Sequence, residues 1–275
     1  PMNSSAASDV YKRQINTALK FGKGGGNTSR SIGGDKDVSF TGGGELDNGT
    51  TFSMTATTND AYGISASTTT ITTPSLGSFS IGSSSGSASY MYDEEVPQAY
   101  EQVSDGKDTM ANKVGDFMDN NSVMYTSPTL EMMGASITAH LGYSPQATDK
   151  AVGDGAQVTY SADVGSGKEA GITISYEGLK LGFYGAERQR TMPEATAGTG
   201  NYQHDEFNGA WYAKYTMGPV SIGYSETYAD AGVTLANETV NTAKTRRAVG
   251  GIYTSESMSI AFNVNDNMSI SYTTS

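Results

Sequence analysis

The fold is decided by hairpins such as the one in residues 211–224, which read WYAKYTMGPVSIGY. Apolar side chains recur at every second position on both sides of a central Met217-Gly218-Pro219 turn. Alternation with a period of two predicts β-strands that each present one apolar and one polar face. The turn is short enough to hold the two strands antiparallel and adjacent.

The same alternation recurs from Ile15 to the end of the chain, and we count thirteen such segments. Their apolar positions are Ile15, Leu19 and Phe21; Val38 and Phe40; Phe52, Met54 and Ala56; Ile64 and Ala66; Phe79 and Ile81; Val123 and Tyr125; Ile137, Ala139, Leu141 and Tyr143; Ile172, Ile174 and Tyr176; Leu181 and Phe183; Trp211, Ala213 and Tyr215; Val220, Ile222 and Tyr224; Met258, Ile260, Phe262 and Val264; and Met268, Ile270 and Tyr272. The sequence therefore predicts an all-β, antiparallel protein.

Connections between these segments alternate between short and long. Short turns are expected at residues 47–49, 74–77, 128–134, 177–179, 217–219 and 265–267, and longer polar loops at residues 22–34, 59–63, 83–121, 144–170, 187–208 and 229–246. This order puts all tight turns at one end of the sheet and all long loops at the other. Transmembrane β-barrels have this asymmetry, so we predict an up-and-down transmembrane β-barrel.

Composition excludes several other classes of protein. The chain has 275 residues, and its 29 acidic against 17 basic residues give a net charge of −12. Nucleic-acid binding needs clustered Lys and Arg, so we set that class aside. With no cysteine, the chain has no disulfide, thiol nucleophile or Cys-type zinc site. The longest apolar run is four residues, Ala210 to Ala213, so any membrane span must be made by strands.

The two ends of the chain differ from its body. Residues 1–14, PMNSSAASDVYKRQ, have neither the basic start nor the apolar core of a signal peptide. We expect a non-native or disordered extension there, followed by one barrel domain over residues 15–275. Residues 269–275 stop inside a strand pattern, which predicts a barrel that lacks its C-terminal strands.

A barrel in lipid turns its apolar stripe outward and encloses a polar, wet lumen. The face opposite the apolar one is mostly Ser, Thr and Gly here, and Tyr and Trp cluster at strand ends, where a membrane interface favours amphipathic rings. A soluble sandwich that buries the apolar face between two sheets is the alternative.

Ser85 to Asn121 is the longest connection that follows a clear strand, and it holds half of the chain's excess negative charge. Its acidic residues are Asp93, Glu94, Glu95, Glu101, Asp105, Asp108, Asp116 and Asp119. Loops this long are usually functional or disordered. We expect this one to fold into the lumen, narrow it and favour cations, as rings of Asp and Glu do in other pores. Alternation makes Lys20 and Lys214 the candidates for the opposing lumen wall. A solvated loop outside the barrel is the alternative.

Four stretches carry a resemblance to a known family: Gly44 to Gly49 (GELDNG), Tyr92 to Glu101 (YDEEVPQAYE), Ser122 to Pro128 (SVMYTSP) and Asn263 to Tyr272 (NVNDNMSISY). Together they resemble the general-diffusion porins of alphaproteobacteria. The resemblance implies a sixteen-stranded, homotrimeric channel in the outer membrane, surrounded by lipid and lipopolysaccharide, that passes small hydrophilic solutes and cations. It also implies that the third long loop, after strand five, forms the constriction. Against sixteen strands, the count of thirteen leaves about three missing.

Other classes of function find little support in the residues. The histidines are His140, expected on the lumen face, and His204, in a polar loop, and neither has partners at metal-ligand or catalytic spacing. We therefore expect neither an enzyme nor a cofactor or metal site. An extracellular adhesin or surface-layer β-protein remains the alternative, since Ser/Thr/Gly-rich acidic chains are common in that class.

Overall fold

The computed structural model describes residues 10–13, 16–21, 30–35, 38–58, 64–83, 87–93, 95–98, 114–147, 164–190, 204–232, 252–265 and 268–274. Within these ranges, helices are confined to short turns, and no helix has the length and apolarity needed to cross a membrane.

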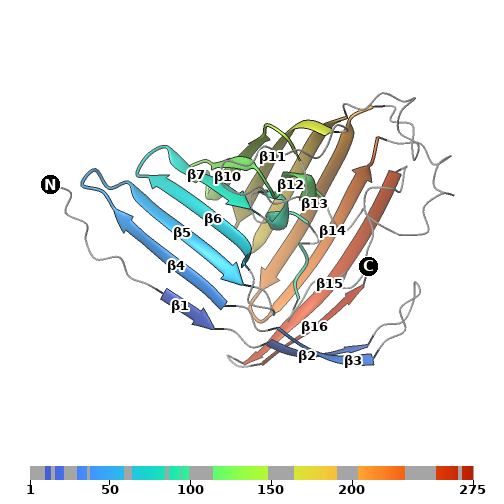
Figure 1. Cartoon of the computed structure of the whole chain (residues 1–275). Coiled ribbons are helices and arrows are strands. Elements are labelled where there is room, and N and C mark those ends of the chain that lie inside the picture. The colour runs from blue at the N-terminus through green and yellow to red at the C-terminus, as the bar shows by residue number, and fades with distance from the viewer. Residues whose placement is uncertain are drawn as a thin grey trace.

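Fourteen strands form one antiparallel sheet (Figure 1). Side by side they are β1 (Val10–Arg13), β4 (Val38–Glu45), β5 (Thr51–Thr58), β6 (Ile64–Thr73), β7 (Gly77–Ser83), β8 (Ser122–Thr126), β10 (Ala135–Ser144), β11 (Val164–Tyr176), β12 (Leu179–Arg190), β13 (Glu206–Met217), β14 (Val220–Asp230), β15 (Ile252–Asn265) and β16 (Met268–Thr274), with β9 (Leu130–Met132) paired to β10. From β4 onward the order follows the chain, which confirms the up-and-down arrangement.

The sheet is strongly curved, with β4 to β7 on one side of a hollow and β12 to β16 on the other (Figure 1). Its strand order runs from β1 at one edge to β16 at the other, and no pairing joins these two edges within the described part of the chain. Each of the thirteen predicted segments is a strand.

The hairpin quoted first shows how the sequence sets these turns. Met217 pairs with Val220, so Gly218 and Pro219 form a two-residue connection, and pairing continues to Phe207 opposite Asp230. Gly218 has a φ of 58°, a left-handed conformation that glycine adopts without steric cost.

Large apolar side chains point away from the hollow. In β12, Phe183 is 46% exposed on the outer face, whereas its neighbour Tyr184 is 7% exposed on the inner face. Other exposed apolar side chains of the outer face are Phe40, Phe52, Ile71, Phe79, Leu141, Ile222, Ile260, Phe262 and Ile270. An apolar outer surface is what a membrane-spanning sheet needs. A soluble sandwich would have sealed these side chains between two sheets.

A pair of neighbouring substitutions tests which face meets lipid. The side chain of Ile222 is 49% exposed on the outer face. Ser221, the residue before it in β14, lies on the inner face. Ile222→Arg is expected to destabilise the folded state by about 1–3 kcal/mol, because Ile222 lies two residues after the start of β14 and the cost of Arg on the lipid face falls from about 2–4 kcal/mol at the bilayer midplane to about 0–1 kcal/mol near the interface. Ser221→Arg, one residue away, is the matched control. Urea unfolding in lipid vesicles measures both, and an equal or larger loss in Ser221→Arg would contradict the assignment of faces.

Three local predictions differ from the structure. Residues 15–21 were expected in the barrel and 22–34 in a loop, but β2 (Asn16–Phe21) pairs with β3 (Arg30–Asp35) in a separate two-stranded sheet. A short loop between two strand-forming segments makes such local pairing entropically cheap.

The second difference is that residues 128–134, expected to form only a turn, include β9, and the chain reverses at Met133 and Gly134, which both have positive φ. The third is that β11 begins at Val164 and β12 continues to Arg190, so strands extend into residues expected in the long loops 144–170 and 187–208. At the N-terminal end, β1 lies within residues 1–14 and pairs with β4. The domain boundary at residue 14 stays a prediction.

Candidate functional site

The connection between β7 and β8, residues 84–121, is called the inner loop below. Its described parts are residues 87–93, 95–98 and 114–121, with short helical turns η1 (Ser89–Met91) and η3 (Asp116–Met118). Figure 1 shows these turns in the hollow of the sheet. The inner face of the main sheet is called the inner wall below. Buried apolar residues of the loop and of this wall form one cluster: Ala88, Tyr92, Val114, Phe117 and Met118 from the loop, and Met124, Ala147, Tyr184, Ala186, Ala210 and Tyr212 from the wall and its connections. The inward fold of this loop is thus confirmed.

Tyr92 is the aromatic anchor of the loop. Its side chain is fully buried, its hydroxyl lies 2.6 Å from Nδ1 of His140, and its ring stacks on Tyr184 with 5.4 Å between ring centres. Thr173 donates a hydrogen bond of 3.4 Å to the same hydroxyl. Burial raises the pKa of Tyr92, so the phenol stays protonated and can donate to the histidine.

A glycine in the inner wall, Gly171 of β11, leaves space for the Tyr92 ring. A Cβ atom at Gly171 would lie 2.5 Å from ring carbons of Tyr92, closer than real Cβ contacts come. Glycine at this position therefore permits the tyrosine to lie flat against β11.

Glu169, also on β11, receives the start of the loop. Its side chain is 4% exposed, and it accepts hydrogen bonds from the Ser87 hydroxyl at 2.7 Å and the Ala88 backbone N–H at 2.9 Å. The Tyr184 hydroxyl donates a third bond of 2.7 Å from β12. One carboxylate thus joins the loop to two strands of the wall.

The later part of the loop packs against β12 and β13. The backbone N–H of Gly115 donates to Oδ1 of Asn208 at 3.3 Å, and the Arg188 guanidinium lies 4.8 Å from the ring centre of Phe117. A cation placed over an aromatic face is attracted by the ring's quadrupole. The contact adds to the burial of Phe117 and holds η3 on the wall.

The middle of the loop contacts strands that lie farther along the sheet, β13 and β15. Glu95 forms an ion pair with Lys214 of β13, and the carbonyl of Pro97 accepts a hydrogen bond from the Ser259 hydroxyl of β15. The Lys214 ammonium also lies 5.1 Å from the centre of the Tyr212 ring. Together with Glu169, these contacts place the loop across the inner face from β11 to β15.

A buried ionic cluster supports the wall beside the loop. Glu206 is 2% exposed and accepts from both Nε and Nη2 of Arg188, the former at 3.1 Å. Arg190 also donates to Glu206, at 2.6 Å, and Nη1 of Arg188 reaches the carbonyl of Ala147 at 3.4 Å. One carboxylate therefore binds two guanidinium groups and ties β12 to β13.

The structure describes half of the predicted acidic residues. Asp93 and Glu95 follow η1, Asp116 begins η3, and Asp119 comes just after it. Glu94, Glu101, Asp105 and Asp108 lie outside the described residues. Of the two predicted wall lysines, Lys214 contacts the loop directly through Glu95. Lys20 is on β2, in the small sheet, and its side chain is outside the described part.

Sequence reasoning missed Glu169, Tyr184 and Arg188 as contacts of the loop. The signal available was their position: each lies on the inward face of its strand, two residues from a Gly or Ala on the same face. His140 was expected on the lumen face, and the structure confirms an inward position against Tyr92. Its partner was invisible in sequence because 48 residues separate the two.

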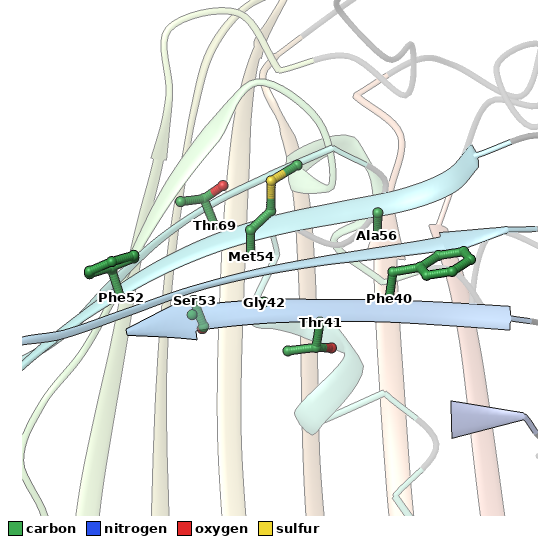
Figure 2. Close-up of a pocket in the computed structure, with 9 residues that line it drawn as sticks. Phe40, Thr41, Gly42, Phe52, Ser53, Met54, Ala56 and Thr69 are labelled. Carbon is green, nitrogen blue, oxygen red and sulfur yellow. The ribbon is translucent and has the colours of Figure 1, made fainter. Parts of the chain in front are cut away.

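On β4 to β6 the outer face has a hollow of about 550 Å³ lined by Phe40, Gly42, Phe52, Met54, Ala56 and Thr69 among others. Figure 2 shows Phe52, Met54 and Thr69 on one side of these strands and Thr41 and Ser53 on the other. The missing side chain at Gly42 leaves space beside the large apolar groups, on the face that meets lipid.

A curved antiparallel sheet with an apolar outer face, a polar inner face and a long loop held inside defines a β-barrel membrane channel. The chain belongs to the Gram-negative porin family, whose family model matches residues 11–273.

Among solved structures, the chain is similar to Salmonella typhi OmpF in complex with daunomycin, at 14% identity, 96% coverage of this chain, 87% of that chain and a TM-score of 0.50. It also matches a loop-deleted OmpT of Vibrio cholerae at 12% identity, with coverages of 95% and 90% and a TM-score of 0.49. A mutant of the Rh. blastica porin matches at 13%, with coverages of 98% and 93% and a TM-score of 0.44. No curated protein sequence matches the chain.

The family places the protein in the outer membrane, as a channel and not an enzyme. It gives no support to the surface-protein alternative.

Proposed function

We propose that this porin passes small hydrophilic solutes by passive diffusion, through a lumen that the inner loop narrows, and that it prefers cations. The observation that carries the proposal is the seating of the acidic loop on the inner wall, with Glu169, Tyr92 and Glu95 as contacts. A loop held there leaves less of the lumen open, and its carboxylates act on ions at short range, where bulk water screens them least.

The distribution of positive charge supports cation preference. Residues 37–106 contain no Lys or Arg, so strands β4 to β7 carry no positive charge on either face. Their inner face carries hydroxyls that bond in pairs across strands, among them Ser39 with Thr57 at 2.8 Å and Thr41 with Thr55 at 2.9 Å. An anion passing this wall meets no counter-charge.

Most basic residues of the inner wall near the loop have an acidic partner, although one glutamate between two arginines leaves that cluster with a net charge of +1, and the Lys180 ammonium also lies on this wall, 6.0 Å from the centre of the Tyr212 ring. Lys214 pairs with Glu95, and Arg188 and Arg190 pair with Glu206. Lipid, lipopolysaccharide and two further copies of the chain, in a homotrimer, are the partners that we propose from the porin family.

Two single substitutions at one ion pair separate cation preference from loop position. Lys214→Gln removes the positive partner and leaves the charge of Glu95, so the cation-to-anion permeability ratio is expected to rise. Glu95→Gln leaves Lys214 uncompensated, so the ratio is expected to fall. Two unit charges 4 Å apart in water interact by about 1 kcal/mol. The loss of one charge should therefore change the cation-to-anion permeability ratio by no more than about fivefold.

The measurement is the reversal potential in a planar bilayer under a salt gradient. The triple variant Asp93→Asn, Glu94→Gln and Glu95→Gln should lower the ratio further. An unchanged reversal potential in the triple variant, or shifts of the same sign in the two single variants, would refute cation preference by this loop.

A further inference from the structure

Glu169 is the one buried carboxylate for which the described residues show hydrogen-bond donors but no ion pair with Lys, Arg or His. By contrast, Glu206, equally buried, binds two arginines. A buried carboxylate costs free energy unless its charge is compensated, and here neutral donors supply the compensation.

The donors come from two different parts of the molecule. Ser87 and Ala88 belong to the first described residues of the inner loop, whereas Tyr184 belongs to the wall. The Ser87 oxygen in turn accepts from the backbone N–H of Ser89 at 2.9 Å, so the bond network extends into η1. Without the carboxylate, the two loop donors would be left buried and unpaired.

The wall leaves room for this arrangement. A Cβ atom at Gly142 of β10 would lie 2.3 Å from Oε1 of Glu169. The carboxylate therefore occupies space that a side chain at position 142 on the neighbouring strand would fill.

We propose that Glu169 is the positioning residue of the inner loop: its ionised carboxylate holds the first turn of the loop on β11 and β12 and so sets the width of the lumen. The proposal rests on the channel function and is independent of cation preference. In the protonated acid one of the two oxygens becomes a hydroxyl donor and a weaker acceptor, and in Gln an NH2 donor replaces one of them, so the bonds from one or two of the three donors are weakened or lost.

Other titratable groups face this site and must be separated from it. Glu169 acts electrostatically on Tyr90 and Tyr92 of the loop and accepts a hydrogen bond from Tyr184 of β12, and phenols ionise near pH 10, far above the acid range. Asp119, which follows η3, acts on Tyr184, and His140 contacts Tyr92. Asp119 and His140 are thus the groups whose titration could mimic that of Glu169.

Single-channel recording in planar bilayers tests the proposal. In Glu169→Gln, brief changes in current that report release of the loop are expected to become about tenfold more frequent at pH 7, the factor that corresponds to one hydrogen bond to a charged group. The matched control is Glu187→Gln, the same change at an exposed outer-face position of β12. The wild type should approach the behaviour of Glu169→Gln as the pH falls from 7 to 4, and the variant itself should not respond. Asp119→Asn and His140→Gln should keep the acid response.

Ser87→Ala provides a test that does not alter the sheet. It removes one donor to Glu169 and should shift the event frequency in the same direction by a smaller factor. The proposal is overturned if Glu169→Gln behaves like Glu187→Gln, if it retains the acid response, or if Ser87→Ala behaves like the wild type. Cation preference is read separately from the reversal potential, so either idea can fail alone.

Discussion

Gly171→Val is expected to push the Tyr92 ring off the inner wall, with a loss of about 3–5 kcal/mol in unfolding free energy, comparable to removal of a large buried aromatic side chain. The added Cβ would lie 2.5 Å from the ring carbons, and the ring has no free space to move into, because Tyr184 stacks on it and His140 holds its hydroxyl. Loss of this contact also frees the loop, so mean single-channel conductance should increase.

Gly209→Val provides the matched control. A Cβ at Gly209 would meet its nearest atoms, in the Phe207 ring and the Tyr184 carbonyl, at 3.5 Å, an ordinary van der Waals distance. The mechanism is tested by a double-mutant cycle with Tyr92→Ala: once the tyrosine is absent, Gly171→Val should cost little more. Additive losses in the cycle would show that Gly171→Val acts on the strand itself and not through Tyr92.

Glu206→Ala is expected to cost about 3–5 kcal/mol, because it leaves the guanidinium of Arg188, 5% exposed, in a buried position without its partner. Arg190 loses the same carboxylate. The side chains of Arg188 and Arg190 are both 6% exposed where they meet Glu206. Because water has little access there, neither guanidinium regains full hydration while the sheet stays folded.

Unfolding by urea in lipid vesicles measures this loss, with Glu187→Ala as the control at an exposed site on the neighbouring strand. Replacement of both partners, in Arg188→Met with Glu206→Leu, should recover much of the stability, since well-packed apolar groups often substitute for a buried ion pair at little cost. A loss below about 1 kcal/mol in Glu206→Ala, typical of a surface ion pair, would contradict the role assigned to the cluster.

The inward course of the loop was predictable from its length, charge and aromatic content, but its contacts were not. Glu95 and Lys214 are separated by 119 residues, and Ser87 and Glu169 by 82. No periodicity links positions so far apart. Lys214 was correctly expected on the inner face by alternation, yet its pairing with an acid of the loop itself depends on where the loop crosses the sheet.

Local pairing was equally hidden at the N-terminal end. The alternation of Leu19 and Phe21 marked a strand correctly, but alternation alone does not choose between β3 and the main sheet as its neighbour. Strand identity is a property of a few residues, whereas strand neighbours are chosen by competition among all exposed edges.

The sequence by itself determined thirteen of the strands, most of the tight turns and the apolar face of each predicted strand, because a period of two and a Gly-Pro or Asn-Gly turn depend on adjacent residues. It did not reveal β1, β3 and β9. Only the tertiary structure decided that Glu169, Tyr92 over Gly171, and Lys214 hold the inner loop. Those contacts form when the curved sheet brings side chains that are distant in sequence within hydrogen-bond or van der Waals distance. The alternation of apolar and polar residues along one strand does not predict which distant residues meet.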